Sequence, residues 1–400
     1  MASFFKKMGP GVLIASAFIG PGTVTACTLA GASFGFGLLW AMLLSIGATM
    51  VLQEMAARLG LVTQKGLAHV IRSQMGSAWL RYLAIGLVVS AIVVGNGAYE
   101  AGNIGGAVLG MQALFGEGGT RHYPFLVGAI AFVLLYLGSY KLLQHIFMVL
   151  VVLMSLSFVC AALVTGPDLW AVLKGLLVPR VPEQAWLTII SLVGTTVVPY
   201  NLFLHASLVN ERWQGVANLP AAKRDTYGAI LVGGVISLCI IISAAALQGA
   251  EVGNVMDLAK SLTPLYGDAA VLLMGVGLFA AGITSAITAP LAAAYVAQSC
   301  FHWQGGLKDW RFRAVWMFIL GLGVGALGFD LNLIQLIAFA QMANGLLLPL
   351  VAIFLFWAAN RTALLGRYVN SGVQNVLGLL IILLSVVLGA KSIFAVLGML

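Results

Sequence analysis

The sequence predicts an all-α integral membrane protein, because its composition, its long apolar segments and its short connections agree. Of its 400 residues, 61% are hydrophobic and only 8% are charged, and the mean hydropathy is +1.05. Soluble domains of average composition are about a quarter charged. A nucleic-acid partner is not expected despite the net charge of +8, since basic residues in such a chain report loop orientation. The expected surroundings are a lipid bilayer.

Eleven apolar segments are each long enough to cross roughly 30 Å of hydrocarbon. Their centres lie near residues 20, 46, 94, 131, 154, 197, 237, 284, 320, 344 and 386. The connections are short, and the longest polar ones are predicted at 171–185 and 249–267. The first segment runs beyond a signal-peptide core, so we interpret it as a retained helix. We therefore predict one transmembrane transporter domain over 1–400.

The positions of lysine and arginine predict how the chain crosses the membrane. With a cytoplasmic N-terminus, 15 of the 20 basic residues lie on the cytoplasmic side. Four lie opposite, namely Arg121, Lys174, Arg180 and Lys260, and Lys391 falls inside the last segment. This bias predicts a multi-pass protein of the cell's inner (plasma) membrane. An odd number of spans then places the C-terminus outside.

Two of the segments are interrupted by proline at corresponding places. Pro21 and Pro199 are 178 residues apart, and each lies in the first span of a group of five. The groups cover about 10–165 and about 186–357, and an extra helix follows at about 373–399. Five is odd, so the second group is inverted relative to the first. Paired breaks in inverted repeats are typical of the substrate site of a secondary transporter.

Several motifs resemble one family of membrane transporters. They are Gly9-Pro10-Gly11, Leu38-Leu39-Trp40, the run from Leu52 to Thr63, Pro199 with Leu204-His205, the run from Gly277 to Thr288, and the run from Ala340 to Pro349. Together they resemble the Nramp (natural resistance-associated macrophage protein) divalent-metal transporters over residues 9–367. The resemblance implies a leucine-transporter-like fold whose first and sixth helices are unwound around the substrate.

The chain departs from this family at the two breaks. Nramp proteins carry Asp-Pro-Gly-Asn in the first helix and Met-Pro-His in the sixth, and the Asp, Asn and Met bind Mn²⁺ or Fe²⁺. Here Gly20, Thr23 and Val198 stand at those three positions, and Tyr200 replaces the first histidine. Only the later His205 is kept. The resemblance therefore implies the family's architecture with a different substrate site.

The remaining side chains at the breaks are neutral hydrogen-bonding groups. The expected substrate-binding residues are Gly20, Thr23, Thr195, Val198, Tyr200, Asn201 and Gln341, the last of which the resemblance places against the substrate. Hard divalent ions prefer carboxylates, and softer metals prefer thioethers. The prediction is a transporter that does not bind Mn²⁺ or Fe²⁺ in the family's manner, and any metal ligands are unknown. The alternatives are a hydrated cation such as Mg²⁺, and a small organic solute or metal complex.

Three polar residues are spaced to share one face of the third span. Asn96, Glu100 and Asn103 follow at i, i+4 and i+7, and Glu100 is the acid placed well inside a span. A carboxylate at mid-membrane costs about 2.5–3.5 kcal/mol, so a proton or ion pathway through Asn96 and Glu100 is expected. The alternative is a protonated Glu100 hydrogen-bonded to its neighbours. His205 is either a proton relay or a packing residue.

Other classes of function find less support in the sequence. There is no nucleotide-binding loop, so no cofactor is expected. No nucleophile–base pair is recognisable, so the chain is not predicted to be an enzyme. An ion channel is disfavoured because broken helices in inverted repeats indicate alternating access. Glu54 and Arg58, one helical turn apart, are predicted to form an ion pair.

Overall fold

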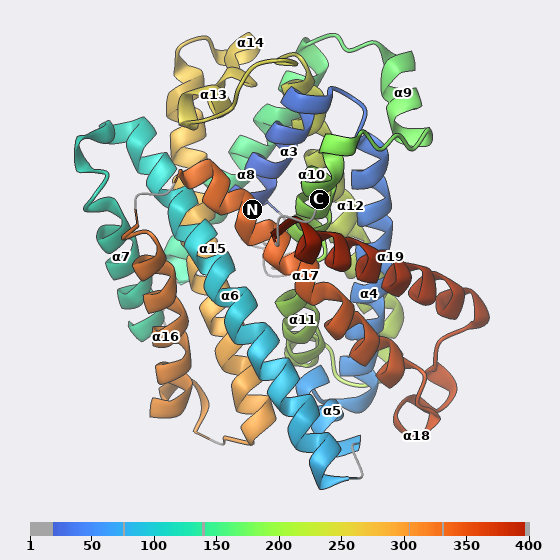
Figure 1. Cartoon of the computed structure of the whole chain (residues 1–400). Coiled ribbons are helices and arrows are strands. Elements are labelled where there is room, and N and C mark those ends of the chain that lie inside the picture. The colour runs from blue at the N-terminus through green and yellow to red at the C-terminus, as the bar shows by residue number, and fades with distance from the viewer. Residues whose placement is uncertain (1–18, 75–76, 138–140, 304, 330–331, 397–400) are drawn as a thin grey trace.

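A computed structural model describes residues 19–74, 77–137, 141–303, 305–329 and 332–396. Within these ranges every regular element is a helix, and the long helices pack side by side in one bundle (Figure 1). The long helices are α3 (Pro21–Phe34), α4 (Leu39–Thr63), α6 (Ala78–Phe115), α7 (Tyr123–Leu137), α8 (Lys141–Val164), α10 (Trp186–Thr196), α11 (Pro199–Arg212), α12 (Leu219–Ala245), α15 (Ala269–Phe301), α16 (Trp310–Ala326), α17 (Leu333–Ala359) and α19 (Gly372–Val396).

Nine of the eleven predicted span centres fall on one of these helices; the centre near residue 20 lies just before α3, and the one near residue 197 lies between α10 and α11. In the described ranges, seven helical segments are long and apolar enough to cross a membrane, or eight with a bent pair. α7 and α16 are shorter, and the residues before α3 lie outside the described ranges. The start of the first repeat and the end of the extra helix also lie outside them. The predicted all-helical membrane fold is confirmed.

Short helices mark the two ends of the bundle. α5 (Leu67–Gln74) and α18 (Thr362–Leu365) lie at the lower end of Figure 1. α9 (Leu169–Leu177), α13 (Val255–Lys260) and α14 (Thr263–Tyr266) lie at the upper end. Lys65, Arg72, Arg361 and Arg367 lie in or beside α5 and α18. We therefore call this end of the bundle the basic end, and we call the end with α9, α13 and α14 the outer end. The separation agrees with the predicted alternation of the loops.

One predicted connection is wrong in part. The segment 171–185 was expected to be polar, but α9 occupies its first half and turns 117° from α8. α9 exposes Leu169, Trp170, Leu173 and Leu177. Apolar and aromatic side chains on a short helix beside a bundle are typical of the membrane interface. With nine residues, α9 is too short to give the signal of a span in the sequence.

Close helix contacts bring the broken helices into the centre of the bundle. α3 packs against α10, α12 and α17, and α6 packs against α15 and α17. A Cβ atom added to Gly110 of α6 would lie 2.5 Å from the carbonyl oxygen of Gly275 in α15. One added to Gly31 of α3 would lie 2.4 Å from that of Ile241 in α12. Small residues therefore allow the backbones to touch, as membrane helix pairs commonly require.

Candidate functional site

A helix starts at the first predicted break, where residues 1–18 lie outside the described ranges, and two helices meet at the second. α3 begins at Pro21, and the carbonyl of Gly20 accepts hydrogen bonds from the amides of Thr23 and Val24 at 3.1 and 3.2 Å. α10 ends at Thr196 and α11 begins at Pro199. Proline is tolerated in the first turn of a helix because its missing N–H has no helical acceptor there. The sequence signal thus located the boundaries of the helices themselves.

Threonine side chains join the two breaks. The hydroxyl oxygens of Thr23 in α3 and Thr195 in α10 are 2.8 Å apart, and both residues are buried. Pro199 has no N–H, so the carbonyl of Thr195 lacks the donor that a continuous helix would supply. Val198, between α10 and α11, is buried. Its side chain is apolar, so its only polar groups are those of the backbone. The two breaks are therefore in direct contact.

Gln341 of α17 lies against both breaks. A Cβ atom added to Gly22 would lie 2.1 Å from Gln341 Nε2, and one added to Gly194 would lie 1.8 Å from the Gln341 carbonyl oxygen. The three residues come from α3, α10 and α17, which only the fold brings together. The absence of side chains at Gly22 and Gly194 is what makes room for Gln341.

Several buried polar atoms of α11 and α17 have no hydrogen-bond partner within the described part of the chain. Asn201 Oδ1, Gln341 Oε1 and Asn344 Nδ2 are buried and have no hydrogen-bond partner. Tyr200 packs edge-on against Tyr99 of α6, with the ring centroids 5.6 Å apart. Buried polar groups in proteins are usually paired, so unpaired ones mark places where a ligand or water would bind. The three amide atoms are two acceptors and one donor, the Tyr200 hydroxyl is a further unpaired group, and none of these side chains is charged.

Glu100 of α6 is buried, and its side chain packs against α16. Its Oε2 accepts a hydrogen bond from Asn103 Nδ2 at 3.2 Å, while Oε1 has no partner. A Cβ atom added to Gly323 of α16 would lie 2.5 Å from Glu100 Cγ, so the side chain packs against α16. Asn96 points to α15 and donates to the Ala289 carbonyl at 2.9 Å. The expected shared face is thus divided between two neighbouring helices.

His205 connects three helices at some distance from the break. Its Nδ1 lies 2.8 Å from Gln53 Oε1 of α4, and its Nε2 lies 3.5 Å from Thr226 Oγ1 of α12. The residue is fully buried. Gln53 and Thr226 were not singled out from the sequence, because polar residues in unrelated helices give no signal that they meet.

No metal-binding cluster occurs in the described part of the chain. No group of three or more histidine, cysteine, aspartate or glutamate side chains gathers there in a way that would hold an ion. Met42 of α4, a thioether near the second break, accepts a contact from Thr196 Oγ1 at 3.7 Å. The chemistry around Gln341 is therefore that of hydrogen bonds between neutral groups.

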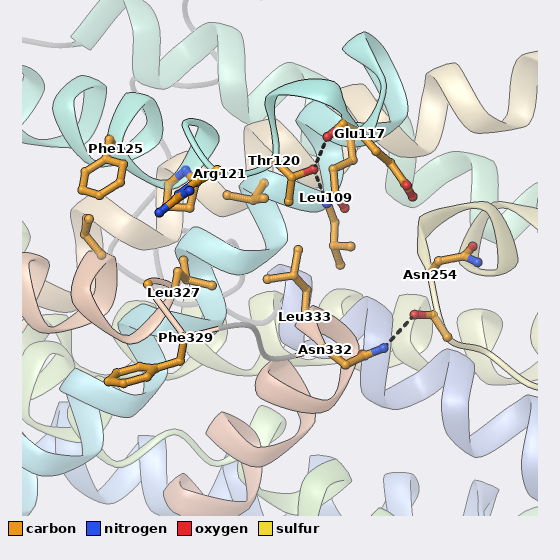
Figure 2. A pocket seen from close by; sticks show the side chains of 16 residues that line it. Leu109, Glu117, Thr120, Arg121, Phe125, Asn254, Leu327, Phe329, Asn332 and Leu333 are labelled. Atoms are coloured by element: carbon orange, nitrogen blue, oxygen red, sulfur yellow. Dashed lines mark hydrogen bonds between the residues drawn. The ribbon is translucent and has the colours of Figure 1, made fainter.

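A cavity of about 700 Å³ opens at the outer end, above the helices that carry the site (Figure 2). Its walls include Leu109 of α6, Leu333 of α17, and Glu117 and Arg121 of the loop between α6 and α7. Asn332 Nδ2 donates to the Gly253 carbonyl at 3.2 Å and ties α17 to the loop before α13. Leu333 precedes Gln341 by eight residues, or about 12 Å of helix. The cavity thus lies at the outer ends of α6 and α17.

Comparison with known families decides which group of proteins this is. Residues 11–395 match the family model described as Nramp, natural resistance-associated macrophage protein-like. The chain belongs to the Nramp family. The match covers nearly the whole chain, including both breaks and α17. It confirms the resemblance found in the sequence motifs.

Relatives and solved structures agree with this Nramp assignment. The divalent metal cation transporter MntH of Yersinia pestis (strain Pestoides F) is 27% identical over 98% of this chain and 95% of its own. A crystallised variant of the Eremococcus coleocola manganese transporter has a TM-score of 0.80 at 22% identity, covering 98% of this chain and 87% of its own. MhsT in complex with L-phenylalanine has a TM-score of 0.61 at 16% identity, covering 96% and 98%. The leucine-transporter-like fold is confirmed, and so is the prediction of a transporter rather than an enzyme.

Proposed function

We propose that this Nramp protein is a secondary transporter that works by alternating access and holds its substrate with neutral hydrogen-bonding groups. The observation that carries the proposal is the position of Gln341 between the two breaks, beside the Thr23–Thr195 contact. We place the protein in the inner membrane with a cytoplasmic N-terminus, on the charge bias of its loops.

The charge of the site argues against a bare Mn²⁺ or Fe²⁺ ion as the substrate. Gly20, Thr23, Val198 and Tyr200 supply neither a carboxylate nor a thioether. An isolated ion that loses its water in an apolar environment is destabilised by on the order of tens of kcal/mol. The curated relatives are named for divalent metal cation transport, so we place the change of substrate at these four positions.

A small polar organic molecule, neutral or zwitterionic, fits the unpaired atoms better than a cation does. Asn201 Oδ1 and Gln341 Oε1 accept hydrogen bonds, whereas Asn344 Nδ2 donates one. A cation with its water shell offers only donors, so it would leave Asn344 Nδ2 unpaired, and a buried unpaired group costs about 1–3 kcal/mol. The second candidate is a hydrated divalent ion such as Mg²⁺, which keeps several waters and would use the two acceptors.

A binding screen on the purified protein tests the proposal. Thermal stability would be measured with Mn²⁺, Mg²⁺ and a panel of small neutral and zwitterionic metabolites. We expect a stabilising organic ligand whose affinity falls about fivefold to tenfold in Thr195→Val, since one hydrogen bond is worth about 1 kcal/mol. Thr49→Val is the matched control, because Thr49 bonds to the Ser45 carbonyl of its own helix.

The same screen has outcomes that would contradict the proposal. Saturable binding of Mn²⁺ at micromolar concentration, weakened by Thr23→Val and not by Thr49→Val, would show that the site still takes a bare metal. Stabilisation by Mg²⁺ alone, with no organic ligand, would favour the second candidate.

Proton coupling is proposed for Glu100. Its Oε1 is buried without a partner, so a proton can be gained or lost there without breaking the bond to Asn103. We expect uptake into proteoliposomes to depend on the pH gradient in the wild type. Glu100→Gln keeps the shape of the side chain but cannot release a proton, so this dependence should disappear. An unchanged pH profile in Glu100→Gln would leave Glu100 as a packing residue.

A further inference from the structure

An apolar groove of about 1050 Å³ runs between α4 and α19, away from the breaks and the outer cavity. Its walls include Gly47, Met50 and Val51 of α4, Tyr227 of α12, and Leu380 and Leu384 of α19. Tyr227 supplies the one polar side chain of the lining. Leu44, Leu380 and Leu383 of its walls are exposed apolar side chains, of the kind that meets the acyl chains of a bilayer.

Gly47 gives the groove direct access to the backbone of α4. A Cβ atom added at Gly47 would meet no other atom within 4 Å. An acyl chain can therefore lie against the helix at this point, and a larger side chain could be introduced there without a clash. Membrane helices and their ligands approach most closely where a side chain is missing.

A basic residue lies beyond the groove lining on α12, toward the basic end. Arg224 precedes Tyr227 by three residues on α12, so it lies one turn farther toward the basic end on the same face. Its side chain is exposed. Asp225 is the neighbouring acid, and the carboxylate of Glu54 is buried and paired.

We propose that an anionic phospholipid binds in this groove, with its acyl chains along Gly47 and Leu384 and its phosphate beside Arg224. Basic side chains near a membrane surface attract anionic headgroups, whereas the apolar walls are indifferent to headgroup charge. A second copy of the chain fits less well, because a two-fold contact would bring the same arginines face to face. The bound lipid would hold α19 against α4.

Native mass spectrometry and thermal unfolding test this proposal on the full-length protein. The probes are phosphatidylglycerol and phosphatidylcholine with identical acyl chains. We expect a retained phosphatidylglycerol adduct, and a larger rise in Tm with phosphatidylglycerol than with phosphatidylcholine. Gly47→Leu fills the groove and should remove the adduct. Arg224→Gln should weaken it about fivefold, the value of one cation at the surface.

Gly321→Leu is the matched control. Gly321 is an exposed helical glycine of α16, it also has nothing within 4 Å of an added Cβ atom, and it is not part of the groove. Gly321→Leu should keep both the adduct and the difference between the two lipids. Equal stabilisation by both lipids, or an adduct that survives in Gly47→Leu, would overturn the proposal. A dimer that dissociates in Gly47→Leu would also overturn it, in favour of a second copy.

Discussion

Gly194→Ala is expected to abolish transport while leaving the protein in the membrane. The added Cβ atom would lie 1.8 Å from the Gln341 carbonyl oxygen and 3.0 Å from the Gly345 amide nitrogen. Both are backbone atoms, so α10 and α17 must move apart. A misplacement of about 1 Å in a functional site can cost about 100-fold in rate, and we expect a loss of at least this size. Substrate uptake into proteoliposomes measures it, with Gly321→Ala as the control.

A second substitution at the same contact separates backbone clash from side-chain clash. At Gly22 the added Cβ atom would lie 2.1 Å from Gln341 Nε2, which belongs to a side chain that can rotate away. We expect the fall in unfolding temperature caused by Gly22→Ala to be partly reversed by Gln341→Ala, which removes the obstructing side chain; the unfolding temperature is the measure here, because Gln341→Ala also removes a substrate-binding group. Gly194→Ala should not be rescued by it, since the obstructing oxygen remains. Rescue of both variants, or of neither, would contradict the packing of α17 against the two breaks.

Glu54→Gln is expected to cause the largest loss of stability. The Glu54 side chain is only 2% exposed. Its carboxylate accepts hydrogen bonds from Arg58 Nε at 3.0 Å, Arg58 Nη2 at 3.1 Å and Gln374 Nε2 at 3.1 Å, and it forms an ion pair with Lys223 Nζ at 2.8 Å. Arg58 is itself buried and also bonds to Asn370 Oδ1. Removing one partner of a buried ion pair leaves an uncompensated charge, which costs about 3–5 kcal/mol. The unfolding temperature in detergent should fall accordingly.

Two further variants show whether the uncompensated buried charge causes the loss of stability in Glu54→Gln. Glu54→Gln combined with Arg58→Met removes both charges, so it should be more stable than Glu54→Gln alone. Lys223→Gln should cost about 1 kcal/mol or less, because Lys223 is 34% exposed and its charge is solvated. An unfolding temperature of Glu54→Gln equal to that of the wild type would refute the network as a source of stability.

The sequence signals that succeeded were those that act within one helix. Pro21 and Pro199 mark helix starts, and Glu54 with Arg58 forms the predicted i, i+4 ion pair at 3.0 Å. A missing N–H and a one-turn spacing have the same consequence in any helical fold. The segment of α9 was the exception, because a short interfacial helix has no span-length signal.

Contacts between helices were much harder to foresee. Glu100 packs on Gly323 and not beside Gln341, and His205 binds Gln53, which is 152 residues away. Gln374 reaches Glu54 across 320 residues. None of these pairs has a local pattern in the sequence, because the partners come from helices that meet only in the folded bundle.

The sequence by itself determined that this is a helical membrane protein of Nramp type, with prolines at two helix starts. The tertiary structure decided which faces of the helices meet, and so placed Gln341 on Gly22 and Gly194 and directed Glu100 toward α16. The physical reason lies in the solvent. In water, an apolar stripe shows which side of a helix is buried. In a bilayer, lipid-facing and protein-facing sides are both apolar, so only packing and hydrogen bonds between helices reveal the contacts.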